Sequence, residues 1–333
     1  MKKGKINLII SLIIGIGILS FIIFYFGTES LELLYNNLQP IYLIPFIFLT
    51  FLTYMTNALR LKIVLKAHGK IVNFWSLLKQ NIAGFAVSYV TPSVRVGGEP
   101  LKLYMMYKEN KVGLKTGSSA LILDKFLEFL GSALFATAGF VVLFFVPGIP
   151  LGLKLFFAFV IFFCSSILFV IWYLTIKEKG SFSKLFNLFR FYKINKLKNF
   201  ATTIEEIEDK MRIFFVKHKP EFLWGTATYI LYGFLTILEF KFLLMALGVN
   251  ASFIQVIVIV VVWGIVNFLP IPGGLGLHEA SQSGLFVFFA GSGGVGLVFS
   301  LMMRFLNLII IGIGFTIISH FGGREIMKKI KSK

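Results

Sequence analysis

Charge and cysteine are the scarcest features of this sequence. Only 14% of its 333 residues are charged, whereas soluble domains carry about 25%, and 57% of its residues are hydrophobic. This composition excludes an ordinary soluble protein and predicts a chain embedded in a bilayer. The single Cys164 excludes an internal disulfide, and the four histidines show no metal-ligand spacing. We therefore expect neither a metal site nor a cofactor.

Acidic residues are also few. The chain has 15 Asp and Glu against 33 Lys and Arg, a formal net charge of +18. Most basic residues flank apolar stretches, which is typical of cytoplasmic loops and of attraction to anionic inner-leaflet lipids. A nucleic-acid-binding protein would instead gather its basic residues on one polar face, so we expect no nucleic-acid partner.

Six apolar stretches are long enough to cross roughly 30 Å of hydrocarbon. They are residues 6–26, 41–61, 118–146, 153–176, 222–247 and 295–321. Basic residues precede the first stretch, flank the end of the second from Arg60 onward, and fill the C-terminal tail. By the positive-inside rule both termini are cytoplasmic, and a multi-pass protein of the plasma membrane is predicted.

Two further segments are interrupted by residues that break helices. The first, about 75–107, breaks at Pro92, and the second, about 253–290, breaks at Pro270 and Pro272, because proline lacks the donor that a helix needs. The flanking charges place both ends of the first segment inside and both ends of the second outside. We therefore expect two re-entrant hairpins of opposite sense. An interfacial helix and loop is the alternative for the first.

The fold class is thus an all-α polytopic membrane protein in a single integral membrane domain, 1–333. Its halves, 1–176 and 222–333, each contain one hairpin and share the order Pro, Gly-Gly, Glu, which suggests an inverted repeat with a site between the halves. The linker, 177–221, is basic and has apolar residues at helical spacing. It predicts an amphipathic helix on the inner surface or beneath the bundle.

The first hairpin contains a candidate phosphate pocket. Arg95 and Glu99 bracket Gly97 and Gly98, and Lys102 follows. An arginine can hold a phosphate through two hydrogen bonds and a lysine adds a point charge. Glu99 would orient Arg95 or take up a proton. The alternative is a loop tied by its own Arg95–Glu99 pair.

The second hairpin and the last span supply the remaining basic and acidic candidates. The hairpin residues are Gly273, Gly274, His278 and Glu279. Arg304 lies within an apolar span, where an isolated cation costs at least about 2.5–3.5 kcal/mol. It therefore needs an internal partner, either Glu279 or Glu99. His278 lines the path or hydrogen-bonds the broken backbone.

One more candidate, Asp124, lies early in the third span. It either pairs with Lys115 or Lys125 or takes part in proton coupling, which burial of a carboxyl group would favour. Glu239 and Lys241 lie in the outer part of their span, and we expect them to reach the interface or to pair locally.

These motifs resemble the flippase-like integral membrane family related to the transmembrane region of lysylphosphatidylglycerol synthases. The likeness rests on TPSVRVGGEP at 91–100, on PGGLG at 272–276 with the glutamate that follows, on the Asp124-Lys125 dipeptide and on Arg304. The resemblance implies movement of charged or phosphate-bearing lipids between leaflets. His278 departs from it, since arginine is expected there, as does Lys125 in place of arginine.

We therefore expect a lipid transporter, not an enzyme. About a dozen residues follow the last span, so we expect no soluble aminoacyl-transfer domain and no synthesis of lysyl lipid. An aminoacylated lipid, a cardiolipin-like phospholipid and a polyprenyl phosphate all remain open as substrates. Without an ATP-binding motif, transport is downhill or coupled to an ion gradient. The alternatives are an enzyme acting on a lipid phosphate through Asp124, Glu128 or Glu279, and a non-transporting scaffold.

Overall fold

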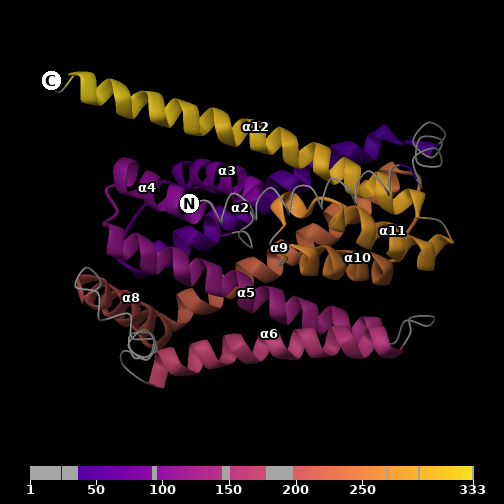
Figure 1. Cartoon of the computed structure of the whole chain (residues 1–333), viewed down its shortest axis with the longest axis horizontal. Helices are drawn as coiled ribbons and strands as arrows, with labels where there is room; N and C mark the ends of the chain where they lie inside the picture. The colour runs from indigo at the N-terminus through magenta and orange to yellow at the C-terminus, as the bar shows by residue number, and fades with distance from the viewer. Residues whose placement is uncertain are drawn as a thin grey trace.

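The structure, a computed structural model, describes residues 24, 37–91, 96–144, 151–177, 198–267, 269, 271–291 and 293–331. Every regular element in these ranges is a helix (Figure 1), which confirms the predicted all-α class. Three helices there are long and apolar enough to cross a membrane: Pro40–Ala67, Lys219–Ala246 and Gly294–Gly323. The predicted span 6–26 lies outside the described residues except for Phe24, so the full number of spans stays a prediction.

Five long helices frame the bundle. They are α2 (Leu43–Ala67), which continues the short 3-10 turn η1 (Pro40–Tyr42), α5 (Leu114–Phe144), α6 (Leu151–Lys177), α9 (Lys219–Ala246) and α12 (Gly294–Lys331). At a rise of about 1.5 Å per residue, even α2 exceeds the hydrocarbon thickness of about 30 Å. α2 packs along α9, and α5 packs against α6 and α9.

Two pairs of shorter helices complete the bundle. α3 (Phe74–Val90) pairs with α4 (Glu99–Asn110), and α10 (Phe253–Val266) pairs with α11 (Leu277–Ala290). The longest of the four, α3, has 17 residues, which reach only about 26 Å, so none of them crosses the hydrocarbon alone. The break between α10 and α11 includes the 3-10 turn η4 (Pro272–Gly274).

The two helix pairs open toward opposite ends of the bundle. One core cluster joins the end of α2, the start of α3 and the loop after α4 through Leu65, Leu77 and Val112. The other joins the start of α2, the start of α10 and the end of α11 through Phe46, Val256 and Phe286. Because α2 runs from one cluster to the other, the hairpins enter from opposite ends (Figure 1). This is the predicted arrangement, and its insertion into a bilayer as re-entrant hairpins stays a prediction.

Helix contacts repeat between the halves. α3 packs on α12 just as α10 packs on α5, and α4 packs on α5 as α11 packs on α12. Matching α2, α3, α4 and α5 with α9, α10, α11 and α12 maps each of these contacts onto another observed contact. The pattern fits an inverted repeat of the kind found in transporters.

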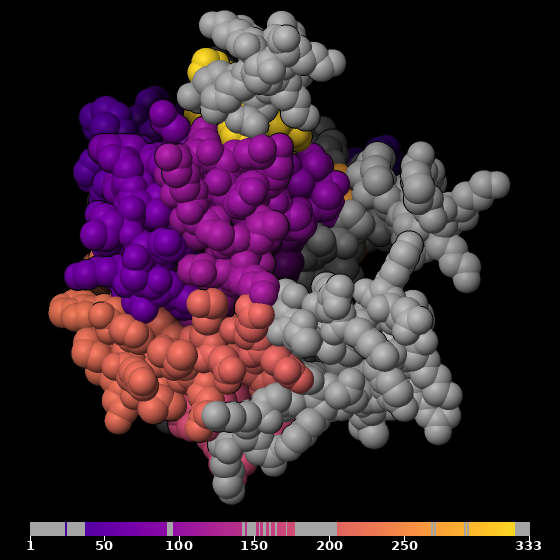
Figure 2. All heavy atoms as spheres, turned by 90° about the vertical axis from the view of Figure 1, so that its left-hand side faces the viewer, coloured from indigo at the N-terminus to yellow at the C-terminus, as the bar shows by residue number. Residues whose placement is uncertain are grey.

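The amphipathic helix α8 (Lys198–Lys217) lies beneath the bundle, the second of the two placements expected for the linker. It packs against α5, α6 and α9, and Met211, Phe214 and Phe215 are buried in the core. Figure 2 looks at this end of the molecule, where α8 lies directly below the surface formed by α2 to α5.

Candidate functional site

Both helix breaks line one cavity of about 190 Å³. Its walls come from α2, α3, α4, α5, α9, α10, α11 and α12 and from the turn that precedes α11. Because one water occupies about 30 Å³ in the liquid, the cavity has room for several waters or for a polar headgroup. Irregular backbone at membrane depth is tolerated where it lines such a cavity, so the breaks have the environment that they require.

One face of α2 forms a polar wall of the cavity. Thr50, Thr53, Asn57 and Arg60 all line it, and their spacing of three or four residues places them on one helix face. The Thr53 hydroxyl donates a hydrogen bond to the Thr50 carbonyl at 2.7 Å, so this hydroxyl has a hydrogen-bond partner within its own helix. From Thr50 to Arg60 the wall is about 15 Å long.

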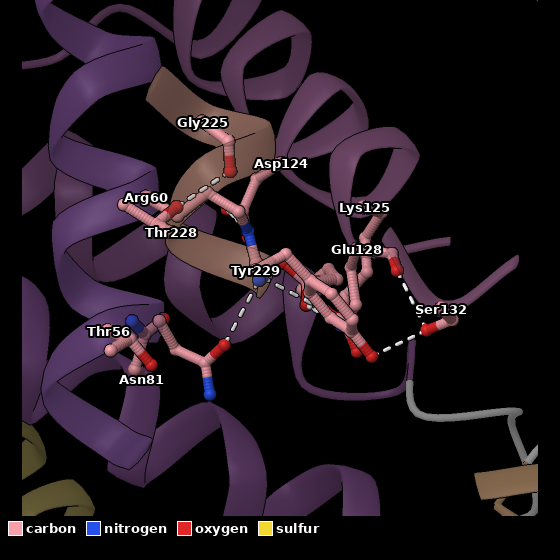
Figure 3. Close-up of polar contacts among 12 residues, drawn as sticks. Thr56, Arg60, Asn81, Asp124, Lys125, Glu128, Ser132, Gly225, Thr228 and Tyr229 are labelled. Carbon is pink, nitrogen blue, oxygen red and sulfur yellow. Dashed lines mark hydrogen bonds and ion pairs between the residues drawn. The ribbon is translucent and has the colours of Figure 1, made fainter. Parts of the chain in front are cut away.

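Arg60 is the centre of the first half of the site (Figure 3). Its Nε donates to Asp124 Oδ1 at 2.8 Å, its Nη2 to Glu128 Oε2 at 3.2 Å and its Nη1 to Asn57 Oδ1 at 3.1 Å. The Tyr229 ring of α9 lies 5.7 Å from Arg60 Cζ, within reach of a cation–π contact. The side chain is only 2% exposed, so this cation belongs to the interior of the bundle.

Two expectations are corrected here. Arg60 is not a flanking charge at the end of its span, because α2 continues to Ala67 and Arg60 is buried beside α5. Asp124 pairs with Arg60 instead of Lys115 or Lys125, while Lys115 pairs with Glu206 of α8 at 2.6 Å. Neighbours along one helix were visible in the sequence, but the partner on another helix was not.

Glu99, the first residue of α4, joins two lysines. Its Oε1 lies 2.8 Å from Lys102 Nζ and 3.4 Å from Lys125 Nζ. The stem of Lys102 crosses Gly84 of α3, where any side chain would collide with it, and its Nζ donates to Asn81 Oδ1 at 3.4 Å. Because Gly84 has no side chain, the Lys102 stem can cross α3 at this point and its ammonium group can reach the cavity.

The glycine pair before α4 allows the two hairpin helices to approach closely. A Cβ at Gly98 would overlap the Gly84 carbonyl, and the Gly98 N–H donates to Ser88 Oγ at 2.8 Å. Gly97 is half-buried beside it. Arg95 lies outside the described residues, so its predicted contact with phosphate stays a prediction.

Arg304 of α12 is the centre of the second half of the site. Its Nε and Nη2 lie 2.7 and 2.5 Å from Glu279 Oε1, and its Nη1 donates to Tyr89 Oη at 3.1 Å and to the Gly273 carbonyl at 3.3 Å. Of the two predicted partners, Glu279 is therefore correct and Glu99 is wrong. The arginine ties α12 to both helix breaks, because Tyr89 lies in the last turn of α3, just before the first break.

The second break places its glycines against aromatic rings. Gly273 and Gly274 both have φ of +57°, which favours glycine. A Cβ at Gly273 would collide with the Tyr89 ring, and one at Gly274 with the His278 ring. His278 is stacked on Trp263 with ring centroids 3.8 Å apart. His278 thus lines the cavity as a tightly packed ring.

Glu239 neither reaches the interface nor pairs locally, the two expected outcomes. It is only 4% exposed, lines the cavity and accepts a hydrogen bond from Thr50 Oγ1 at 2.6 Å. Lys241 behaves as predicted, since it donates to Asn250 Oδ1 at 2.9 Å and to the Ala251 carbonyl. Two residues apart on a helix point to different sides, and the sequence alone did not show which side faced the cavity.

The pairs Glu99–Lys125 and Glu279–Arg304 occupy matching positions in the two halves. Each glutamate lies in the first turn of its hairpin's second helix. The cations follow on the next long helix, 26 residues after Glu99 (125 minus 99) and 25 residues after Glu279 (304 minus 279). This spacing is the sequence signal that would have identified Lys125 as a site residue.

The described residues around the cavity nearly balance in charge. Four are cations: Arg60, Lys102, Lys125 and Arg304. Five are carboxyl groups: Glu99, Asp124, Glu128 and Glu239 on the cavity wall, and Glu279 behind Arg304. The described cations around the cavity are therefore paired with carboxyl groups, and the predicted phosphate pocket of Arg95 and Lys102 stays a prediction.

Comparison with known proteins agrees with the motifs. A family model described as the lysylphosphatidylglycerol synthase TM region matches residues 8–314. The chain is 22% identical over 335 residues to a UPF0104 membrane protein of Methanothermobacter thermautotrophicus, covering 97% of this chain and 98% of the relative. It is 25% identical over 296 residues to one of Pyrococcus horikoshii, covering 83% and 85%. No solved structure matches. The chain belongs to the family of the lysylphosphatidylglycerol synthase transmembrane region.

Proposed function

We propose that this protein moves a phosphate-bearing lipid between the two leaflets of the cell membrane, as a transporter and not as an enzyme. The observation that carries the proposal is the cavity on which both helix breaks meet. It holds charged side chains between helices long enough to span a membrane, and intramembrane ionisable residues mark substrate or ion pathways. Membership of the family supports the same function.

The cations of the cavity would bind the headgroup phosphate. Lys102 and Lys125 on one side and Arg304 on the other line the same space, and each has a carboxylate partner. In the empty protein these carboxylates offset the cost of burying the cations. An entering phosphate would take over part of that pairing, while the lipid tails stay in the bilayer and save about 0.8 kcal/mol per CH₂.

Access from both sides would come from the two hairpins. Because they open toward opposite ends of the bundle, movement of either one would expose the cavity to one leaflet. The contacts of Arg304 with Tyr89 and with the Gly273 carbonyl join the two hairpins, so they are the bonds that such a movement would break. We place the α8 end and both termini in the cytoplasm, where the basic residues meet anionic inner-leaflet lipids.

Lipid movement in liposomes tests the proposal. Purified protein is reconstituted with a fluorescent phospholipid, a polyprenyl phosphate or an uncharged lipid, and the fraction that reaches the other leaflet is followed by chemical quenching. The test variant is Glu279→Gln/Arg304→Gln, which removes a pair without leaving a buried charge. The control is Lys241→Gln, a cation of a spanning helix that hydrogen-bonds outside the cavity.

We expect the wild type and the control to move at least one phosphate-bearing lipid. The double variant should move it at least about tenfold more slowly, which corresponds to a loss of about 1.4 kcal/mol of binding free energy. Equal rates for protein-free and wild-type liposomes across both phosphate lipids would contradict the proposal. Recovery of a chemically altered lipid by mass spectrometry would instead point to an enzyme.

A further inference from the structure

One carboxyl group of the cavity differs from the other four in its partner. Four have a cation within 3.4 Å. They are Asp124 and Glu128 with Arg60, Glu99 with Lys125, and Glu279 with Arg304. Glu239 instead has a hydroxyl group as its hydrogen-bond partner, Thr50 Oγ1 at 2.6 Å, and none of the ion pairs among the described residues includes it.

The position of Glu239 makes its ionised form costly. It lies within the membrane-spanning helix α9, and its side chain is almost fully buried. A carboxylate in such surroundings without a cation is expensive, and the neutral acid avoids that cost. At the same time Glu239 lines the cavity, so it is accessible to any water that enters with a lipid headgroup.

We propose that Glu239 is the proton-binding site through which lipid movement is coupled to a proton gradient. The inference rests on the proposed function. It assigns to Glu239 the proton-coupled role that was open for Asp124, because Asp124 has Arg60 as its ion-pair partner.

The charge balance of the cavity supports the coupling. With Glu239 protonated, the described residues of the cavity comprise four cations and four carboxylates, since the fifth carboxyl group is then neutral. A phosphate headgroup adds negative charge to this balanced set, and an ionised Glu239 would add more. Headgroup binding therefore favours the protonated state of Glu239, and by linkage protonation favours headgroup binding to the same extent. The proton and the anionic lipid would move together.

Other ionisable groups line the cavity with Glu239 and contribute to its charge balance. They are Tyr54 and Arg60 of α2, Tyr89 of α3, Glu99 and Lys102 of α4, Asp124, Lys125 and Glu128 of α5, Tyr232 of α9, His278 of α11 and Arg304 of α12. Between Glu239 and Arg60 the polar wall of α2 offers Thr53 and Asn57, and water along these groups can pass a proton. Glu239 therefore has a polar connection to the headgroup cations.

An imposed pH difference across the liposome membrane tests the inference. Movement of the phosphate-bearing lipid is compared with and without the gradient in wild type, in Glu239→Gln and in Glu206→Gln, an exposed carboxylate of α8. We expect the gradient to stimulate wild type and Glu206→Gln about fivefold or more, and to leave Glu239→Gln unchanged. Lipid movement that ignores the gradient in wild type, or equal stimulation of Glu239→Gln, would overturn the inference while leaving the proposed function intact.

A second readout does not depend on transport. A hydrophobic carbodiimide adds the O–H of a protonated carboxylic acid across one C=N bond and rearranges to an N-acylurea, so the protein gains the mass of one reagent molecule. We expect peptide mass spectrometry to locate this adduct at Glu239 at neutral pH. If wild type moves no lipid, the proposed function fails and this measurement decides the proton site alone: an adduct at Glu239 retains it, and no adduct there overturns it.

Discussion

The two halves of the molecule hold a glutamate at each helix break in different ways. Glu99 is 12% exposed and shared by two lysines, whereas Glu279 is completely buried and has one arginine. In both, the cations contact Oε1, and Oε2 has no hydrogen-bond partner among the described residues. Glu99 of the first half can therefore exchange one lysine for the other within a network. Glu279 of the second half has a single ion pair, and its arginine also holds the two hairpins together through Tyr89.

The largest effect on stability is expected from Arg304→Met, which breaks the Glu279–Arg304 ion pair. It leaves Glu279 buried without a cation, and such a change costs about 3–5 kcal/mol. Thermal unfolding in detergent, followed by tryptophan fluorescence, should show a large fall in the apparent Tm. Glu279→Gln/Arg304→Gln should recover most of the loss. A double variant as unstable as the single one would show that the charge left behind is not the cause.

The next largest loss of stability is expected from substitution of the glycines at the two breaks. Gly273→Ala places a side chain at positive φ against the Tyr89 ring, and Gly98→Ala pushes one into the Gly84 carbonyl, so each should cost about 1–3 kcal/mol of stability. Gly264→Ala is the control, because a Cβ there meets nothing within 4 Å and alanine favours a helix. Tolerance of either break variant in the same unfolding assay would contradict the close packing described for that hairpin.

The smallest effect is expected from Lys125→Met, the counterpart of Arg304→Met in the first half. Glu99 keeps Lys102 and Glu128 keeps Arg60, so the loss should be about 1 kcal/mol. Unfolding of the two methionine variants side by side measures the contrast directly. A Lys125 variant as unstable as the Arg304 variant would contradict the distinction between the network around Glu99 and the single ion pair of Glu279.

Much of the second half was predictable from sequence, because a charged residue within an apolar span requires a partner of opposite charge. An arginine within an apolar span cannot remain isolated, and a glutamate after a Pro-Gly-Gly break was the nearest available acid. The prediction of Glu279 for Arg304 is confirmed for that reason. The opposite sense of the hairpins likewise followed from flanking charges, and the helix ends in the structure agree with it.

The first half was harder because its signals have common alternative explanations. Arg60 lies near the end of an apolar stretch, where basic residues usually mark a cytoplasmic flank. Only the continuation of α2 to Ala67 shows that it is buried. Glu239 was missed because composition gives the depth of a residue in a span but not the face of the helix on which it lies.

The central claim is that the two halves of the molecule bind one headgroup, and a double-mutant cycle on lipid movement tests it most directly. Lys102→Arg in the first hairpin and Arg304→Lys in the last helix each keep the charge but alter its geometry, and rates are measured singly and together. If both side chains contact the same phosphate, the combined loss should differ from the product of the single losses by about threefold or more. Losses that simply multiply would contradict a shared site.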